Sequence, residues 1–228
     1  MSAVSSWMGQ ADGIAVLSVR FPEMSLRGPR LLRRTAVWIK AELDAGARPA
    51  IVVGTHSRRA DWVDGAGTAG AARGLAGSRE LDRARAAAED LVAATLALAL
   101  SALGVGARSL SARDAELEGA GDLGAGVLRH LDARYVAELL AGDVVPVLPG
   151  GHVARGDGET VMLGPGGADL TAVALAAALG GACHFLRDPG RPSSPVRSIH
   201  PDVVAKAETL GVTVVRRSFE PRTAGMVP

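Results

Sequence analysis

Two hydrophobic periods alternate along the chain. The segments 13–20 and 49–54 are short runs of mostly consecutive apolar residues, the pattern of strands whose two faces are both buried. Between them, 28–43 carries apolar residues at helical spacing, and Gly46 follows as a stop signal. A strand, a helix and a second strand in this order predict a parallel sheet with helices packed on its faces.

The rest of the chain continues this alternation. We expect a Gly-rich hairpin at 150–158 and loops at 64–78 and 189–198, where Gly, Ala, Pro or Ser accumulate. Further helices are predicted at 79–103, 132–140, 169–179 and 201–210, and further strands at 107–110, 143–148, 182–186 and 212–215. The predicted fold class is therefore α/β, a three-layer α/β/α sandwich with a mostly parallel central sheet. We expect one domain over 1–228, with 1–12 disordered.

Composition narrows the class of protein. The chain has 25 Lys and Arg against 24 Asp and Glu, a net charge of +1, which favours neither a nucleic acid nor an anionic membrane as partner. Its single cysteine, Cys183, cannot form a disulfide within the chain, and no signal peptide is visible, so we expect a cytoplasmic protein. The apolar segment 91–105 is shorter than a bilayer requires and is predicted to be a buried helix.

One segment suggests a binding site. A strand is followed by the turn Gly164-Pro-Gly-Gly167 and then by a helix that we expect to begin at Asp169. Glycines let an anion approach the backbone, and a helix N-terminus supplies unpaired N–H groups and a positive dipole. The same pattern also occurs in ordinary loops.

The wider context resembles the kinase domain of aspartokinases. In that family a strand and a short hairpin precede Thr-Thr-Leu-Gly-Arg-Gly-Gly-Ser-Asp-Thr-Thr-Ala-Val-Ala-Leu-Ala-Ala-Ala-Leu. Here 145–150 and then 160–179 follow the same order, the latter reading Thr-Val-Met-Leu-Gly-Pro-Gly-Gly-Ala-Asp-Leu-Thr-Ala-Val-Ala-Leu-Ala-Ala-Ala-Leu. Further on, 197–201 and 215–219 resemble the family's Lys-Val-Leu-His-Pro and Val-Arg-Ser-Ser-Phe segments.

The resemblance implies an amino-acid-kinase fold and a set of site residues. It implies catalytic roles for Asp169, as the acid that orients a lysine, and for Glu89, as the remaining acid of the Thr-Gly-Glu substrate motif. It implies phosphate or nucleotide contacts for a second set of residues. These are Gly164, Gly166, Gly167, Asp188 and Arg197. The regulatory domains usually attached at the family's C-terminus have no counterpart within 1–228.

The first strand departs from the family. Where aspartokinases carry Lys-Phe-Gly-Gly, this chain has Ser18-Val-Arg-Phe21. Serine cannot supply the lysine's charge, and Arg20 and Phe21 place bulk where the resemblance expects bare backbone. Losing such an electrostatic stabiliser typically costs about 10²–10³ in rate.

The nucleotide side departs as well. The family's Arg and Ser in the turn are Pro165 and Ala168, its long nucleotide loop shrinks to 187–190, and its Lys before His-Pro is Arg197. Because phosphoryl transfer depends on positioning and charge, these changes remove most of what the protein contributes to it.

Each residue also has a structural interpretation. Asp169 could be a helix N-cap, Gly166 and Gly167 a tight turn, and Glu89 a solvated helix residue. The five histidines show no metal-ligand spacing, so no metal site is expected, and His200 is interpreted as a helix start. Cys183 is interpreted as an inert core residue.

Three hypotheses follow. The chain has lost phosphoryl transfer and acts as an accessory or repurposed protein that binds a small amino-acid-like ligand. Alternatively it is still a kinase that uses Mg-ATP to phosphorylate the carboxylate of aspartate or a related amino acid. As a third hypothesis it is an interaction partner, a homodimer or a heteromer with an aspartokinase relative, paired through the helix at 91–105.

Overall fold

The central element of the fold is a six-stranded parallel sheet. The computed structural model describes residues 14–22, 29–56, 77–187 and 199–218. The strand order is β10-β9-β1-β2-β6-β3, and each neighbouring pair is parallel. The strands are β1 (Ile14–Pro22), β2 (Arg48–His56), β3 (Ala107–Ser109), β6 (Val145–Pro149), β9 (Ala182–Arg187) and β10 (Val214–Ser218). The apolar runs of β1 and β2 lie side by side at the middle of the sheet, where both faces are covered.

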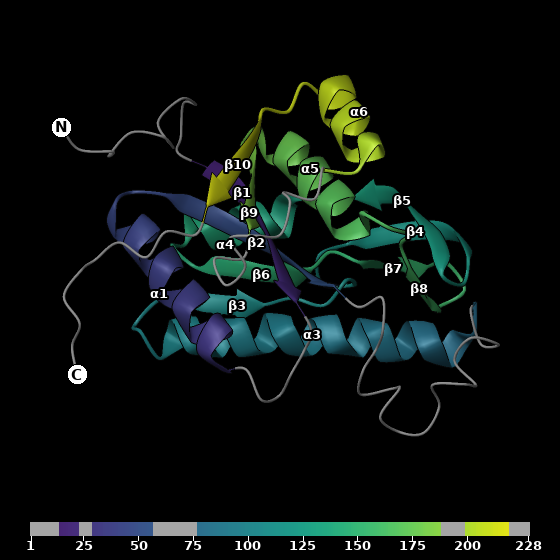
Figure 1. Cartoon of the computed structure of the whole chain (residues 1–228), viewed down its shortest axis with the longest axis horizontal. Coiled ribbons are helices and arrows are strands. Elements are labelled where there is room, and N and C mark those ends of the chain that lie inside the picture. Colours follow the sequence, from purple (N-terminus) through teal and green to yellow (C-terminus); the bar gives the residue numbers. More distant parts are fainter. Residues whose placement is uncertain (1–13, 23–28, 57–76, 188–198, 219–228) are drawn as a thin grey trace.

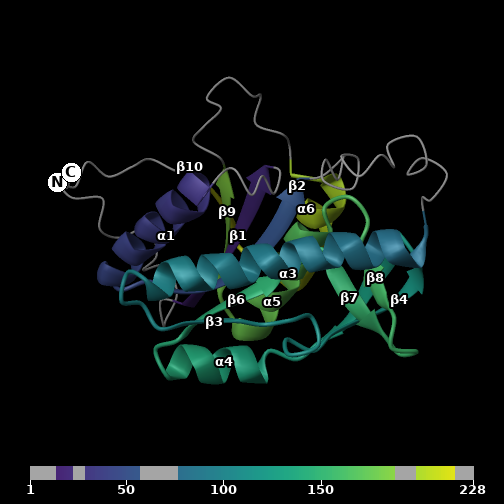
Figure 2. The same ribbon diagram turned by 90° about the horizontal axis from the view of Figure 1, so that it is seen from below.

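Helices cover both faces of this sheet (Figures 1 and 2). One face packs against α1 (Pro29–Asp44) and α3 (Arg79–Ser101), and this core contains Leu17, Ile39 and Leu96. The other face packs against the second group of helices. These are α4 (Arg134–Ala141), α5 (Gly167–Leu179) and α6 (Pro201–Leu210). Because side chains alternate along a strand, β1 sends Leu17 and Val19 to the first core and Val16 to the second. The predicted three-layer α/β/α fold with a mostly parallel sheet is confirmed.

A second, four-stranded sheet lies beside the first, and its strand order is β5-β4-β7-β8. Its strands are β4 (Leu117–Asp122), β5 (Ala125–Leu131), β7 (His152–Arg155) and β8 (Thr160–Met162). The hairpin predicted at 150–158 is present as β7 and β8, but β4 and β5 were not predicted. β4 contains Gly119 and Gly121, which weaken the strand signal. Gly119 is explained by tertiary packing, because a Cβ there would lie 2.4 Å from Val153 Cγ2.

The element boundaries follow local signals. The helices α5 and α6 end at Gly180 and Gly211, which both adopt the left-handed conformation that glycine tolerates best. His200 is the N-cap of α6, and its Nδ1 accepts a hydrogen bond from Asp202 N at 3.4 Å, so the interpretation of His200 as a helix start is confirmed. Predictions for 1–12 and for the loops at 64–76 and 189–198 lie outside the described residues, and the single-domain assignment stays a prediction.

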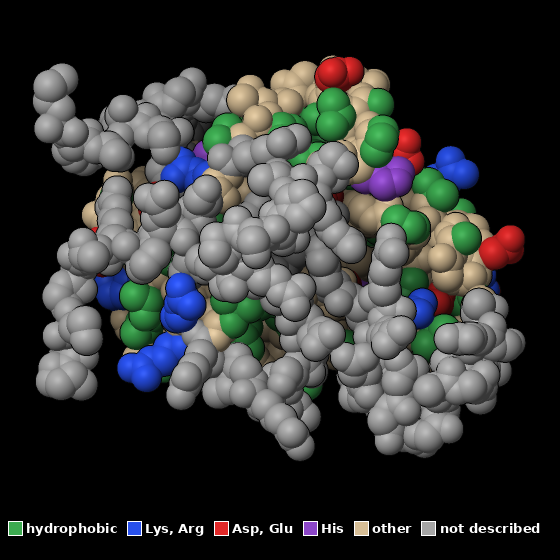
Figure 3. All heavy atoms as spheres, viewed as in Figure 1, with side chains coloured by type: hydrophobic (Ala, Val, Ile, Leu, Met, Phe, Trp, Pro, Cys, Tyr) green, Lys and Arg blue, Asp and Glu red, His purple; other side chains and the backbone are tan. Residues whose placement is uncertain are grey.

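The described surface carries charge of both signs. On the face shown in Figure 3, the coloured Lys and Arg side chains and the Asp and Glu side chains are scattered over several elements. None of the described helices is long and apolar enough to span a membrane.

Candidate active-site cleft

A buried hydrogen bond joins the first strand to the glycine-rich helix. Ser18 Oγ of β1 donates to Asp169 Oδ1 of α5 at 2.9 Å, and both residues are almost fully buried. The resemblance places the family's lysine at Ser18 and its orienting acid at Asp169. The two positions are therefore neighbours in space although 151 residues separate them in sequence.

The turn before α5 has the geometry of a tight turn. Gly167 N donates to Gly164 O at 2.9 Å, and Gly166 is the N-cap with φ 85°. The helix begins at Gly167, two residues before the predicted start, so the interpretation of Asp169 as the N-cap is wrong. A Cβ at Gly164 would meet no atom within 4 Å, which leaves this backbone open beside a helix N-terminus. A phosphate contact at Gly164, Gly166 or Gly167 stays a prediction.

The first turn of α5 lies against the carboxyl ends of two strands. A Cβ at Gly54, in β2, would come within 2.6 Å of Ala168 Cβ. A Cβ at Gly150, directly after β6, would come within 2.9 Å of Ala168 Cα. Thr171 Oγ1 also donates to Gly150 O at 2.7 Å. Sequence reasoning did not single out Gly54, although a glycine at the end of an apolar run was the available signal.

Glu89 is a second buried carboxylate at the same edge of the sheet. It lies on α3 with an exposed fraction of 2%, so the interpretation as a solvated residue is wrong. Its Oε2 accepts from Gly151 N at 2.8 Å and its Oε1 accepts from Thr55 N at 3.2 Å. A carboxylate that accepts backbone N–H groups from the ends of two neighbouring strands ties those strand ends together.

His152 extends this polar cluster. Its ring is buried, with Nδ1 3.4 Å from Glu89 Oε2 and Nε2 3.7 Å from Asp90 Oδ1. Burial raises the pKa of Asp90, and the negative charge of Glu89 adds to this effect, while the charge of His152 opposes it. The cluster of Glu89, Asp90 and His152 was not predicted, because β7 and α3 meet only in the folded chain.

Several predicted residues cannot be placed in this cleft. Asp188 and Arg197 lie outside the described residues, as does the side chain of Arg20. Phe21 is described, and its side chain is buried in the core that faces α1 and α3. Its ring therefore packs in the core, which corrects the expectation that it places bulk where the family's first strand has bare backbone.

A separate polar cluster lies where β9 and β10 pack against α1. Arg217 Nε donates to His184 Nδ1 at 2.8 Å, and Arg217 Nη1 lies 3.7 Å from Glu42 Oε2 of α1. Burial lowers the pKa of His184 to about 4, and the positive charge of Arg217 adds to the effect. His184 is therefore a neutral acceptor at neutral pH.

Cys183 is fully buried beneath α5, which agrees with its interpretation as a core residue. Burial raises the pKa of its thiol well above the usual range, and the negative charge of Asp169 adds to the effect. The thiol is therefore protonated and a poor nucleophile.

A cavity of about 310 Å³ lies at the other edge of the sheet. It is lined by residues at the amino ends of β2 and β6, including Arg48 and Asp143. Ligands of open parallel sheets bind at the carboxyl ends of the strands. We therefore place the candidate cleft beside Ser18, Asp169 and Glu89 and not at this cavity.

The fold and these motif residues together define the class of protein: the chain matches the amino acid kinase family over residues 24–188 and belongs to that family. The match begins after β1, so Ser18 lies outside it. Within the family the curated relatives are aspartokinases. The chain is 40% identical to an aspartokinase of Helicobacter pylori over 101 residues, which is 44% of this chain and 25% of that protein. It is 32% identical to an aspartokinase of Mycobacterium tuberculosis over 149 residues, 64% of this chain and 34% of that one.

Solved structures show the same fold. Aspartate kinase from Synechocystis superposes with a TM-score of 0.63 at 23% identity, covering 92% of this chain and 39% of that chain. E. coli aspartokinase III, in complex with aspartate and ADP, gives a TM-score of 0.62 at 16% identity, covering 92% and 63%. This chain thus spans about a quarter to a third of the length of the curated aspartokinases it matches.

Proposed function

We propose that this chain is an aspartokinase-like protein that has lost phosphoryl transfer and binds a small amino-acid-like carboxylic acid, as an accessory or repurposed member of the family. The observation that carries the proposal is the hydrogen bond from Ser18 Oγ to Asp169 Oδ1. The acid of the motif is present, and one of its partners is a neutral hydroxyl at the position where the resemblance expects a lysine. A hydroxyl brings no positive charge to a transferring phosphoryl group.

The turn supports the same proposal. Pro165 and Ala168 stand where the family has Arg and Ser, and Ala168 is packed against the strand ends through Gly54 and Gly150. Proline has no N–H to offer an anion and alanine no hydroxyl. The bare backbone at Gly164 and the helix dipole of α5 remain, and they suit the carboxylate of a small acid.

The alternative function is an ATP-dependent kinase acting on the carboxylate of aspartate or a related amino acid, with Mg-ATP as cosubstrate. The retained turn and the buried position of Asp169 favour it. In that case an arginine such as Arg20 or Arg197 replaces the lysine, as a planar fork in place of a compact ammonium.

A turnover assay separates the two functions. The purified protein is incubated with Mg-ATP and L-aspartate, and both ADP release and hydroxylamine-trapped acyl phosphate are measured. We expect no aspartate-dependent product. Aspartate-dependent turnover by the unmodified chain contradicts the proposal and establishes the kinase.

Ser18→Lys is the informative variant, with Ser18→Ala as its control. If only the lysine has been lost, Ser18→Lys gains turnover that Ser18→Ala does not. If the chain has also lost the residues that bind the nucleotide, neither variant shows aspartate-dependent turnover of Mg-ATP. A thermal-shift series with aspartate-like acids then tests binding, since a ligand at about 100 times its Kd stabilises the native state by about 2.7 kcal/mol. Absence of any shift contradicts the binding role.

For the partner we propose a homodimer, or a heteromer with an aspartokinase relative, formed through the outward face of α3. Leu91 and Leu98, seven residues apart on that helix, have exposed fractions of 45% and 70%. This spacing places both side chains on one stripe of the helix. Light scattering of the protein alone and mixed with an aspartokinase tests this; a monomer in both samples contradicts it.

A further inference from the structure

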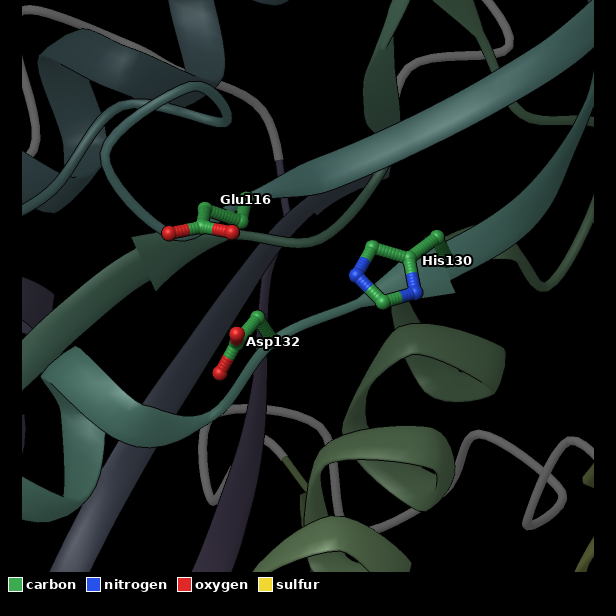
Figure 4. Close-up of side chains that lie close together, drawn as sticks. All are labelled: Glu116, His130 and Asp132. Atoms are coloured by element: carbon green, nitrogen blue, oxygen red, sulfur yellow. The ribbon is translucent and has the colours of Figure 1, made fainter.

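The β4–β5 hairpin brings an imidazole and two carboxylates together. The two strands are antiparallel, with Leu117 opposite Leu131. Glu116 precedes β4, His130 lies on β5, and Asp132 follows β5. One ligand atom from each of the three lies within 4.8 Å of the other two, and Figure 4 shows the three side chains grouped around one space.

The register of the hairpin explains this grouping. His130 and Asp132 are two residues apart, so both lie on the face opposite to Leu131. Leu131 packs against the core together with the fully buried Leu117. The three polar side chains therefore occupy the outer face at the end of a hairpin whose inner face is fixed by burial. His130 lies on a paired strand, and Glu116 and Asp132 each directly adjoin a strand of the same pair, which limits how far the three side chains can move apart.

Asp132 is held in place by its neighbour. Its Oδ1 accepts from Arg134 N at 2.8 Å and its Oδ2 accepts from Arg134 Nε at 2.7 Å. Outer hydrogen bonds of this kind orient the carboxylates that ligate metals. Each oxygen keeps a further lone pair for a ligand.

The charge balance also favours a cation. Two carboxylates on adjoining strands repel each other. The exposed guanidinium of Arg134 pairs with Asp132 Oδ2 at 2.7 Å, so this one cation is set against two carboxylates, Glu116 and Asp132. An ion that shares an oxygen of each carboxylate relieves this repulsion.

We propose that Glu116, His130 and Asp132 bind a divalent transition-metal ion, with Zn²⁺ as the ion of best fit. Imidazole suits Zn²⁺ and its neighbours in the first transition row, whereas Mg²⁺ and Ca²⁺ prefer oxygen ligands alone. Three protein ligands leave a coordination position for water or for a group of another molecule. The site involves none of the residues of the candidate cleft and is independent of the proposed function.

Isothermal titration with Zn²⁺ tests the site, using the full chain without a histidine tag. We expect one site per chain, and at least about tenfold weaker binding in His130→Ala and in Glu116→Gln. Both replaced side chains are exposed, so both variants should keep the fold, which circular dichroism checks. If one of them misfolds, the other still decides the question. Co²⁺ in place of Zn²⁺ should give a visible absorption spectrum that both variants lose.

Two control variants distinguish coordination of Zn²⁺ at the site from a general electrostatic attraction of the ion to the protein surface. Glu138→Gln removes an exposed charge from α4, the same change in net charge as Glu116→Gln. His200→Ala removes an exposed imidazole whose Nδ1 lies 3.4 Å from Asp202 Oδ2. Unchanged Zn²⁺ affinity in both controls supports the site. Equal affinity of the unmodified chain and His130→Ala, or an equal loss in Glu138→Gln, overturns it.

Discussion

Asp169 and Glu89 are two buried carboxylates at the same edge of one sheet, and they differ in the groups that donate hydrogen bonds to them. Asp169, on α5, accepts a hydrogen bond from the side chain of Ser18. Glu89, on α3, accepts two hydrogen bonds from the backbone, at Thr55 and Gly151. A side-chain partner can change by one substitution, whereas a backbone N–H is present whatever residue stands there, proline excepted.

This difference separates an acid that supports the backbone from an acid that contacts a side chain. Glu89 binds the backbone at the carboxyl ends of β2 and β6, so the fold needs this acid with or without a substrate. At Asp169 the hydroxyl of Ser18 satisfies one carboxylate oxygen without bringing a charge. The retention of an acid is therefore weaker evidence for activity than the identity of the group that faces it.

The largest loss of stability is expected when Glu89 is replaced. Glu89→Gln replaces one carboxylate oxygen by an N–H₂ group, which cannot accept from a backbone N–H. One buried donor loses its partner, and we expect a loss of about 3 kcal/mol in the free energy of unfolding, measured in urea. The control is Glu80→Gln on the same helix, whose side chain is 77% exposed, with an expected change below about 0.5 kcal/mol. Similar losses in both variants contradict the backbone-support role.

A smaller loss of stability is expected at His184, a buried group that accepts a hydrogen bond from the side chain of Arg217. Its pKa is lowered to about 4 in the native state, from an ordinary value of 6.5. As the pH falls from 6.5 to 4 the unfolded chain gains a proton at His184 that the native chain does not. Stability therefore decreases over this window, by about 2 to 3 kcal/mol, and the contribution levels off below pH 4.

His184→Gln isolates this contribution. Glutamine can accept from Arg217 Nε through its side-chain oxygen but does not titrate. Urea unfolding at a series of pH values should show a shallower loss of stability between pH 6.5 and 4 in the variant. The same slope in both proteins contradicts the assignment of the effect to His184.

The smallest loss of stability is expected when Ser18 is replaced. Ser18→Ala removes the hydroxyl that donates to Asp169 but leaves a buried site of similar size. We expect a loss of about 1.5 kcal/mol, because one hydrogen bond to a charged acceptor is lost. Ser101→Ala, at the exposed end of α3, serves as the control. No loss on Ser18→Ala would show that the hydroxyl adds nothing to the scaffold.

The sequence predicted the helices and the parallel strands because each carries a local signal. Continuous apolar runs mark β1 and β2. Helical periodicity with a following glycine marks α1, and a run rich in Ala and Leu that ends before Gly180 marks α5. The strands β4 and β5 lack such a signal. The residues Glu116, His130 and Asp132 could therefore not be recognised as neighbours, since their proximity depends on the antiparallel register of strands that were not foreseen.

What the sequence by itself determined is the resemblance to the family and which residues stand at particular positions. Ser18, Pro165 and Ala168 can be read directly, and no folding can give a serine the charge of a lysine. Only the tertiary structure decided what the remaining acids contact. Ser18 meets Asp169 across 151 residues, and Glu89 meets Gly151 across 62. Such partners depend on how α3 and α5 pack against the sheet, and packing is a property of the whole chain and not of any local segment.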